Sequence, residues 1–259
     1  MSQPLVTVLV TTQGADAQGI MTTLADARAQ TWPNRELVVV GPGPDLPGVT
    51  RLENPRFAGE GPAMLYGLRH AKGRWVAWFP AGSRSAPDRI VRQVQALHVR
   101  GDFCALSWRG AETRQSMRIA PGLLFADGAE PASLLIARAR LPTVEDRGFF
   151  VEGLARALAA RVACETTGAV TLLKSPLVTA APKPPGEADC EEALAIELQS
   201  LCTALGLCNA APPNGTQQRL MQVLLPQVRA AAEALTRARN ALFLGDARPK
   251  WTVPDEVGP

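Results

Sequence analysis

Cysteine and histidine, the residues that most often bind zinc, are few in this chain, and they are not grouped. The five cysteines do not occur in CxxC pairs, and there are only two histidines, His70 and His98. Because zinc sites take closely spaced Cys and His ligands, this pattern argues against a zinc site. It is typical of small buried thiols in a reducing compartment. For a single arginine such as Arg84, a solvated surface position is the commoner outcome.

The elements that must position any such site begin with a strand, a helix and a second strand. Residues 5–10 are rich in β-branched side chains and predict a buried strand. Residues 16–30 carry apolar side chains at helical spacing, and residues 36–40 form a second apolar run. Short connections between these elements predict a right-handed parallel βαβ unit.

The same alternation continues along the chain and predicts an α/β fold. Residues 61–71 and a segment opened by Ala86-Pro87-Asp88 are expected to be helical, as are residues 151–162. The further expected strands are residues 49–52, 74–79, 103–108, 116–119 and 133–137. The strand at 74–79 runs directly into Pro80-Ala81-Gly82-Ser83.

Ala29-Gln30 is followed by Thr-Trp-Pro-Asn at residues 31–34, two residues and then the apolar run of residues 37–40. This segment resembles the family 2 glycosyltransferases of the GT-A fold, which typically read AQTYPN, two residues and then a hydrophobic strand. A second part of the family pattern reads N-G-A-G and then A-x-G-x-Y-x-A. It is matched by Asn54, Gly59, Ala63 and Gly67, followed by residues 71–77. The resemblance covers roughly residues 4 to 180. It implies a GT-A-like three-layer α/β/α domain with a mostly parallel sheet, followed here by a C-terminal helical hairpin.

The chain departs from the family pattern at the positions where the family carries its acidic and metal-binding residues. The metal-binding D-x-D of the family falls on Pro80-Ala81-Gly82, and its acids after the second strand fall on residues 41–44, Gly-Pro-Gly-Pro. A divalent ion normally offsets the diphosphate charge of a sugar nucleotide and stabilises the leaving diphosphate. Neither Pro80 nor Gly82 has a side-chain ligand. We therefore expect a divergent member that lacks the D-x-D motif and holds no metal or other cofactor.

The resemblance also indicates where the remaining site residues belong. Glu152 lies near the position where an inverting transferase places its base, although helix 151–162 could equally present it to solvent. For the pair Glu145-Asp146 a loop or cap role is the stronger interpretation. The nucleotide-pocket positions implied by the resemblance are Thr11, Thr12, Gly41, Pro42, Pro80, Gly82 and Arg84.

The chain is expected to divide at a Pro-rich stretch. Residues 1–180 form the GT-A-like domain, and residues 181–187 form a linker that can continue neither a helix nor a central strand. Residues 188–245 carry leucines at helical spacing and predict a helical hairpin. Residues 246–259 are expected to be a flexible tail, or less commonly a docked peptide anchored by Trp251.

Composition narrows the functional classes. The net charge is +3, and the 27 Lys and Arg residues are scattered, which argues against a nucleic-acid-binding protein. No apolar run approaches the roughly 20 residues needed to cross a bilayer, and we expect a cytoplasmic location. Two functions stay open: a catalytically degenerate homologue that acts as a binding or scaffolding protein, with the C-terminal helices as partner surface, and an active metal-independent transferase. In the second, Arg84 or another cation would meet the phosphates of a nucleotide sugar and Glu152 would act as base.

Overall fold

The structure of the chain is a computed structural model. It describes residues 3–53, 60–108, 116–118, 129–141 and 170–180, together with the single positions 155, 158, 159 and 162. The expected linker, helical hairpin and tail after residue 180 lie outside the described residues, as do Glu145, Asp146 and Glu152.

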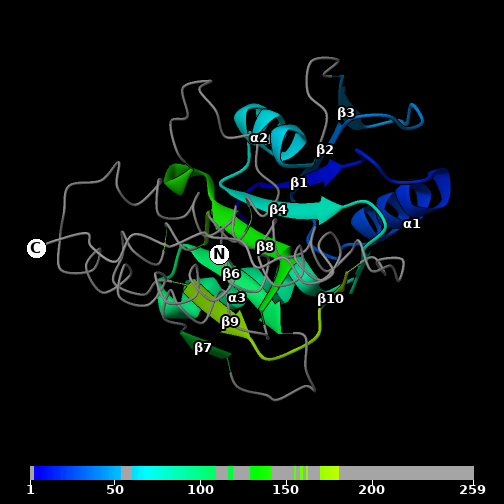
Figure 1. Cartoon of the computed structure of the whole chain (residues 1–259). Helices are drawn as coiled ribbons and strands as arrows, with labels where there is room; N and C mark the ends of the chain where they lie inside the picture. Colours follow the sequence, from blue (N-terminus) through cyan, green and yellow to red (C-terminus); the bar gives the residue numbers. More distant parts are fainter. Residues whose placement is uncertain are drawn as a thin grey trace, which may run out of the picture.

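An eight-stranded sheet forms the centre of the molecule, with the strand order β3-β2-β1-β4-β8-β6-β9-β7 (Figure 1). Six strands run in the same direction, and β8 and β7 run against them. The strands are β1 (Val6–Thr11), β2 (Arg35–Val40), β3 (Val49–Leu52), β4 (Trp75–Pro80), β6 (Cys104–Trp108), β7 (Ser116–Arg118), β8 (Ala129–Ala137) and β9 (Val170–Leu173). The expected mostly parallel α/β sheet is confirmed.

Both faces of the sheet are covered, which makes a three-layer domain. The helices are α1 (Ala17–Arg28), α2 (Glu60–His70) and α3 (Arg89–Arg100). Alternate residues of β4 point to opposite faces: Trp78 belongs to the core under α2, and Phe79 to the core under α1 and α3. Because β1 and β4 are buried on both faces, they are almost continuously apolar, as central parallel strands are.

Local chemistry accounts for the ends of the helices. The Asp16 carboxylate accepts a hydrogen bond of 2.7 Å from the Gly19 amide and so caps the start of α1. Gly101 ends α3 in the left-handed conformation at φ 68°, and its N–H bonds the Leu97 carbonyl. In the part of the chain that the structure describes, none of the helices could span a bilayer.

The structure differs from the sequence expectations where contacts between distant segments determine the secondary structure. Helix α3 begins only after Asp88, so Pro87 precedes the helix, and the Pro87 carbonyl accepts a hydrogen bond from the Thr31 amide. The short pair β5 (Arg84–Ser85) and β10 (Val178–Thr179) forms a second sheet that has no strong hydrophobic pattern of its own. Of the expected helix 151–162, the four described residues are helical, and all four are buried: Ala155, Leu158, Ala159 and Val162.

Candidate functional site

The carboxyl ends of β1, β2 and β4 meet at one edge of the sheet, which we call the carboxyl edge. Thr11, the last residue of β1, lies in register with Val40 of β2 on one side and Pro80 of β4 on the other. The structure therefore brings together the segments that carry Thr11–Thr12, Gly41–Pro42 and Pro80–Gly82. In open α/β sheets, ligands bind outside such an edge.

The threonines of the carboxyl edge are buried and hydrogen-bonded within the protein. Thr12 Oγ1 donates to the Pro42 carbonyl at 2.6 Å and also lies 3.2 Å from the Val40 carbonyl. The indole N–H of Trp78 donates to Thr11 Oγ1 at 3.0 Å. The Thr12 hydroxyl thus fixes the chain after β2, and the Thr11 hydroxyl holds the Trp78 side chain of β4.

Gly41 is required by the geometry after β2. Its φ is 110°, and a Cβ atom there would lie 2.6 Å from Thr12 Oγ1. The Gly41 amide donates to the Leu52 carbonyl of β3 at 3.1 Å. A side chain at this position would displace the Thr12 hydroxyl, so an acidic residue does not fit in this backbone conformation.

The turn after β4 is also satisfied internally. The Pro80 carbonyl accepts hydrogen bonds from the Ser83 amide at 3.2 Å and from Ser83 Oγ at 2.6 Å. The Gly82 amide, at φ 86°, donates to Thr23 Oγ1 of α1 at 3.0 Å. The Ala81 amide donates to the Thr11 carbonyl at 2.8 Å. These bonds tie the turn to β1 and α1.

These residues do not fit a divalent metal. Hard cations such as Mg²⁺ need several oxygen ligands, normally including carboxylates. Pro80 and Gly82 have no side-chain oxygen, and the Pro80 carbonyl and Ser83 hydroxyl already bond each other. Among the residues that the structure describes, no group of three or more His, Cys, Asp or Glu side chains is placed to hold a metal.

Arg84 is tied to α1. Its guanidinium makes two hydrogen bonds to the Asp26 carboxylate, at 2.9 and 3.3 Å, and Asp26 also accepts from the Ser85 amide at 2.8 Å. The hydrogen bond and the charge of Asp26 raise the pKa of the Arg84 guanidinium. The side chain is two-thirds exposed, at 66%. A phosphate at Arg84 would therefore have to compete with Asp26.

A second cation, Arg89, lies in the core behind the carboxyl edge. Its side chain is fully buried, and its guanidinium lies 4.3 Å from the centre of the Phe79 ring. Its Nη2 donates to the carbonyls of Trp78, at 2.9 Å, and Leu134, at 3.3 Å. Arg89 therefore joins α3 to β4 and β8.

The charge of Arg89 is set by burial and by one acid. Burial lowers the pKa of its guanidinium to about 9, and the charge of Glu130 opposes that shift. The group is therefore still protonated at neutral pH. Arg89 Nε also donates to Gln93 Oε1 at 3.1 Å. The sequence could have indicated that this pair is buried, because Arg89 and Gln93 are at helical spacing and share a helix face with Ile90, Val94 and Leu97.

Comparison with solved structures identifies the fold. The chain is similar to the mannosyltransferase PcManGT from Pyrobaculum calidifontis in complex with GDP-Man and Mn²⁺, with a TM-score of 0.60 and 19% identity over 93% of this chain and 76% of that one. It is also similar to S. aureus TarS 1-349 in complex with UDP-GlcNAc, with a TM-score of 0.56 and 14% identity over 91% of this chain and 74% of that one. The fold is that of the GT-A glycosyltransferases.

At these identities the likeness establishes the GT-A fold alone. No protein-family model matches the chain, and no curated protein matches it either.

Proposed function

We propose that this chain is a divergent, family 2-like GT-A protein that acts as a binding or scaffolding protein and not as a metal-dependent glycosyltransferase. One observation carries the proposal. The three segments of the carboxyl edge offer no carboxylate at Gly41, Pro42, Pro80 or Gly82, and their hydroxyls hydrogen-bond within the protein.

The charge of a sugar nucleotide explains why these residues matter. Its diphosphate carries negative charge that a bound divalent ion would offset, and the same ion would stabilise the leaving diphosphate. Without these carboxylates, the leaving diphosphate would lack that stabilisation when its bond to the sugar breaks. The nearby cation, Arg84, is bonded to Asp26. A GT-A fold with this edge is better suited to holding a ligand or a partner than to transferring a sugar.

Calorimetric titration of the full chain with UDP-GlcNAc and GDP-mannose, each with and without Mn²⁺, tests the proposal. We expect no effect of Mn²⁺ on the heat of binding, whether or not a nucleotide sugar binds weakly. Saturable binding at micromolar concentration that requires Mn²⁺ would overturn the proposal. A Mg²⁺ series controls for non-specific effects of the ion.

The metal-independent transferase is the alternative that the same protein can test. Incubation with nucleotide sugar and chelator, followed by chromatographic detection of released UDP or GDP, measures transfer and hydrolysis. If this alternative holds, Arg84→Gln and Glu152→Gln each reduce product release. Arg28→Gln, which changes an exposed arginine at the end of α1, is the matched control. We expect no release above the buffer rate.

The scaffolding role is proposed to use the C-terminal segment, because residues 188–245 carry leucine stripes outside the GT-A-like region. Deleting residues 187–259 should abolish co-purification of a protein partner, while the remaining domain keeps its thermal unfolding transition. A complex that survives the deletion would contradict this assignment.

A further inference from the structure

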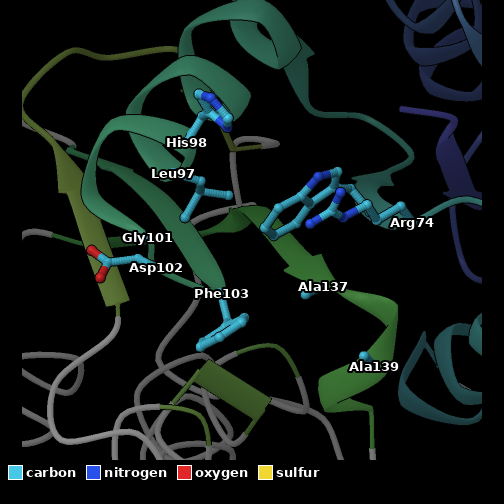
Figure 2. A pocket seen from close by; sticks show the side chains of 9 residues that line it. Arg74, Leu97, His98, Gly101, Asp102, Phe103, Ala137 and Ala139 are labelled. Carbon is cyan, nitrogen blue, oxygen red and sulfur yellow. The ribbon is translucent and has the colours of Figure 1, made fainter. Parts of the chain in front are cut away.

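A pocket lies at the opposite end of the parallel strands, which we call the amino edge. Its volume is about 210 Å³, and its lining comes from the start of β4, the end of α3, and the end of β8 with the turn that follows it (Figure 2). Trp75, at this end of β4, is five residues from Pro80. At about 3.3 Å per residue, the pocket and the carboxyl edge are roughly 16 Å apart. The pocket therefore cannot be part of the candidate nucleotide site.

The body of the pocket is apolar and aromatic. Trp75 and Leu97 are buried, and Ala137 pairs with Trp75 across β8 and β4. The ring of Phe103 completes this side of the pocket, and the Arg140 guanidinium lies 4.2 Å from the centre of that ring. Apolar walls with a few polar groups are typical of small-molecule sites. The volume is below the roughly 300 Å³ of the smallest drug-sized pockets, so it suits a ligand with one ring.

Two exposed polar side chains on the pocket are an arginine and a histidine. Arg74 and His98 line it and are exposed, and within the described part of the chain neither side chain has a hydrogen-bond or ion-pair partner. In Figure 2 the Arg74 side chain extends from the start of β4 toward the pocket, and His98 lies on α3. An arginine with unused donors beside apolar walls is suited to bind a carboxylate through two parallel hydrogen bonds.

The negative groups nearby are already satisfied. Asp102, the acidic residue of the lining, is buried and accepts a hydrogen bond of 2.5 Å from Thr171 Oγ1 of β9. Figure 2 shows its carboxylate directed away from Arg74. At the end of α3, the Leu97 carbonyl accepts hydrogen bonds from the amides of Gly101 and Asp102, so this carbonyl is also bonded within the protein.

We propose that the amino-edge pocket binds a small organic carboxylate with a single flat ring, with Arg74 on the carboxylate and the walls formed by Trp75, Leu97 and Phe103 around the ring. His98 adds a second donor at the rim. The site is separate from the carboxyl edge and does not depend on whether the chain binds a nucleotide sugar.

Calorimetric titration of the full chain with benzoate, up to roughly 10 mM, tests this site. We expect saturable binding at one site per chain. Benzamide, which keeps the ring but lacks the charge, should bind at least 10-fold more weakly, and so should acetate, which keeps the charge but lacks the ring. The absence of saturable benzoate binding would overturn the proposal.

Two variants locate the binding. Arg74→Met removes the cation and should weaken benzoate binding at least 10-fold. Ala139→Leu should narrow the pocket and weaken benzoate binding to a similar extent. Both positions are exposed, so the thermal unfolding midpoints should stay near that of the original chain. Lys72→Met, a change of another exposed cation two residues from Arg74, is the matched control and should leave affinity unchanged. Loss in Arg74→Met alone would indicate a surface anion contact and would overturn the pocket assignment, as would unchanged binding in both variants.

Discussion

The two edges of the sheet use their polar groups in opposite ways. At the carboxyl edge, the Thr12 hydroxyl, the Pro80 carbonyl and the Gly82 amide bond other parts of the protein. At the amino edge, Arg74 and His98 line a pocket without a partner among the described residues. In a GT-A fold the first edge is the expected place for an anionic ligand. Arg74, which lines a pocket and has no partner among the described residues, lies at the second edge.

This difference shows that the framework of the fold does not depend on charged groups at the carboxyl edge. The framework is held by apolar strands and backbone pairing. The hydrogen bonds within the carboxyl edge stabilise the strand ends without a ligand. Four substitutions test this division between the edges, and they are ordered by the expected size of the effect.

Arg89→Met should have the largest effect on stability. It removes a buried cation that bonds the Trp78 and Leu134 carbonyls and interacts with Glu130, and it leaves those groups buried without this partner. We expect a loss of about 3 to 5 kcal/mol in the free energy of unfolding, measured by urea denaturation. The control is Arg74→Met at the amino edge, which should change stability little. Equal effects of the two changes would remove the distinction between a structural and a ligand-binding cation.

Gly73→Ala tests the framework of the amino edge. A Cβ atom at Gly73 would clash with the backbone nitrogen of Thr7 and would lie 2.7 Å from the Trp75 carbonyl. The Gly73 amide also donates to Thr7 Oγ1 at 2.9 Å and to Glu36 at 3.2 Å, and so joins β1, β2 and β4. We expect a loss of roughly 1 to 3 kcal/mol, because the backbone must shift.

Gly43→Ala is the matched control for this change, since its Cβ would meet only Ile20 Cγ2, at 3.7 Å, an ordinary contact. Its urea midpoint should stay close to that of the original chain. If Gly73→Ala behaved in the same way, the strand starts at the amino edge would be less tightly packed than described.

Thr12→Val tests the carboxyl edge itself. The change keeps the shape of the side chain but removes the hydroxyl that donates to the Pro42 carbonyl. We expect a loss of about 1 kcal/mol, typical of one buried hydrogen bond, and faster hydrogen exchange of the Gly41 amide. Thr50→Val on the exposed side of β3 serves as control. An unchanged hydrogen-exchange rate of the Gly41 amide would mean that its hydrogen bond to Leu52 of β3 is enough to hold the end of β2.

Arg84→Gln should have the smallest effect. Its guanidinium is exposed and pairs with Asp26 at the surface, where ion pairs contribute little because water and salt screen them. We expect a urea midpoint within experimental error of the original. A clear destabilisation that disappears in 1 M salt would show that the β5 connection depends on this ion pair.

The order of elements up to β4 could be predicted from the sequence, because each signal is local. Residues 49–52 form β3 as expected, and Ile90, Val94 and Leu97 of α3 are buried as their spacing predicts. The segments of the carboxyl edge could be placed together for the same reason, since parallel βαβ units bring their strand ends to one edge. The position of β8 between β4 and β6 could not be predicted, because antiparallel insertion depends on pairing between distant segments.

The sequence by itself determined that this chain has an α/β framework with Gly41, Pro42, Pro80 and Gly82 directly after its apolar strands, since both follow from residue type and spacing. Only the tertiary structure decided where the cations lie and what they do. Arg84, Arg89 and Arg74 are chemically alike, yet one is paired at the surface with Asp26, one is buried, and one lines a pocket. Burial and neighbouring groups set the role of an arginine, and both arise from contacts between residues far apart in the chain.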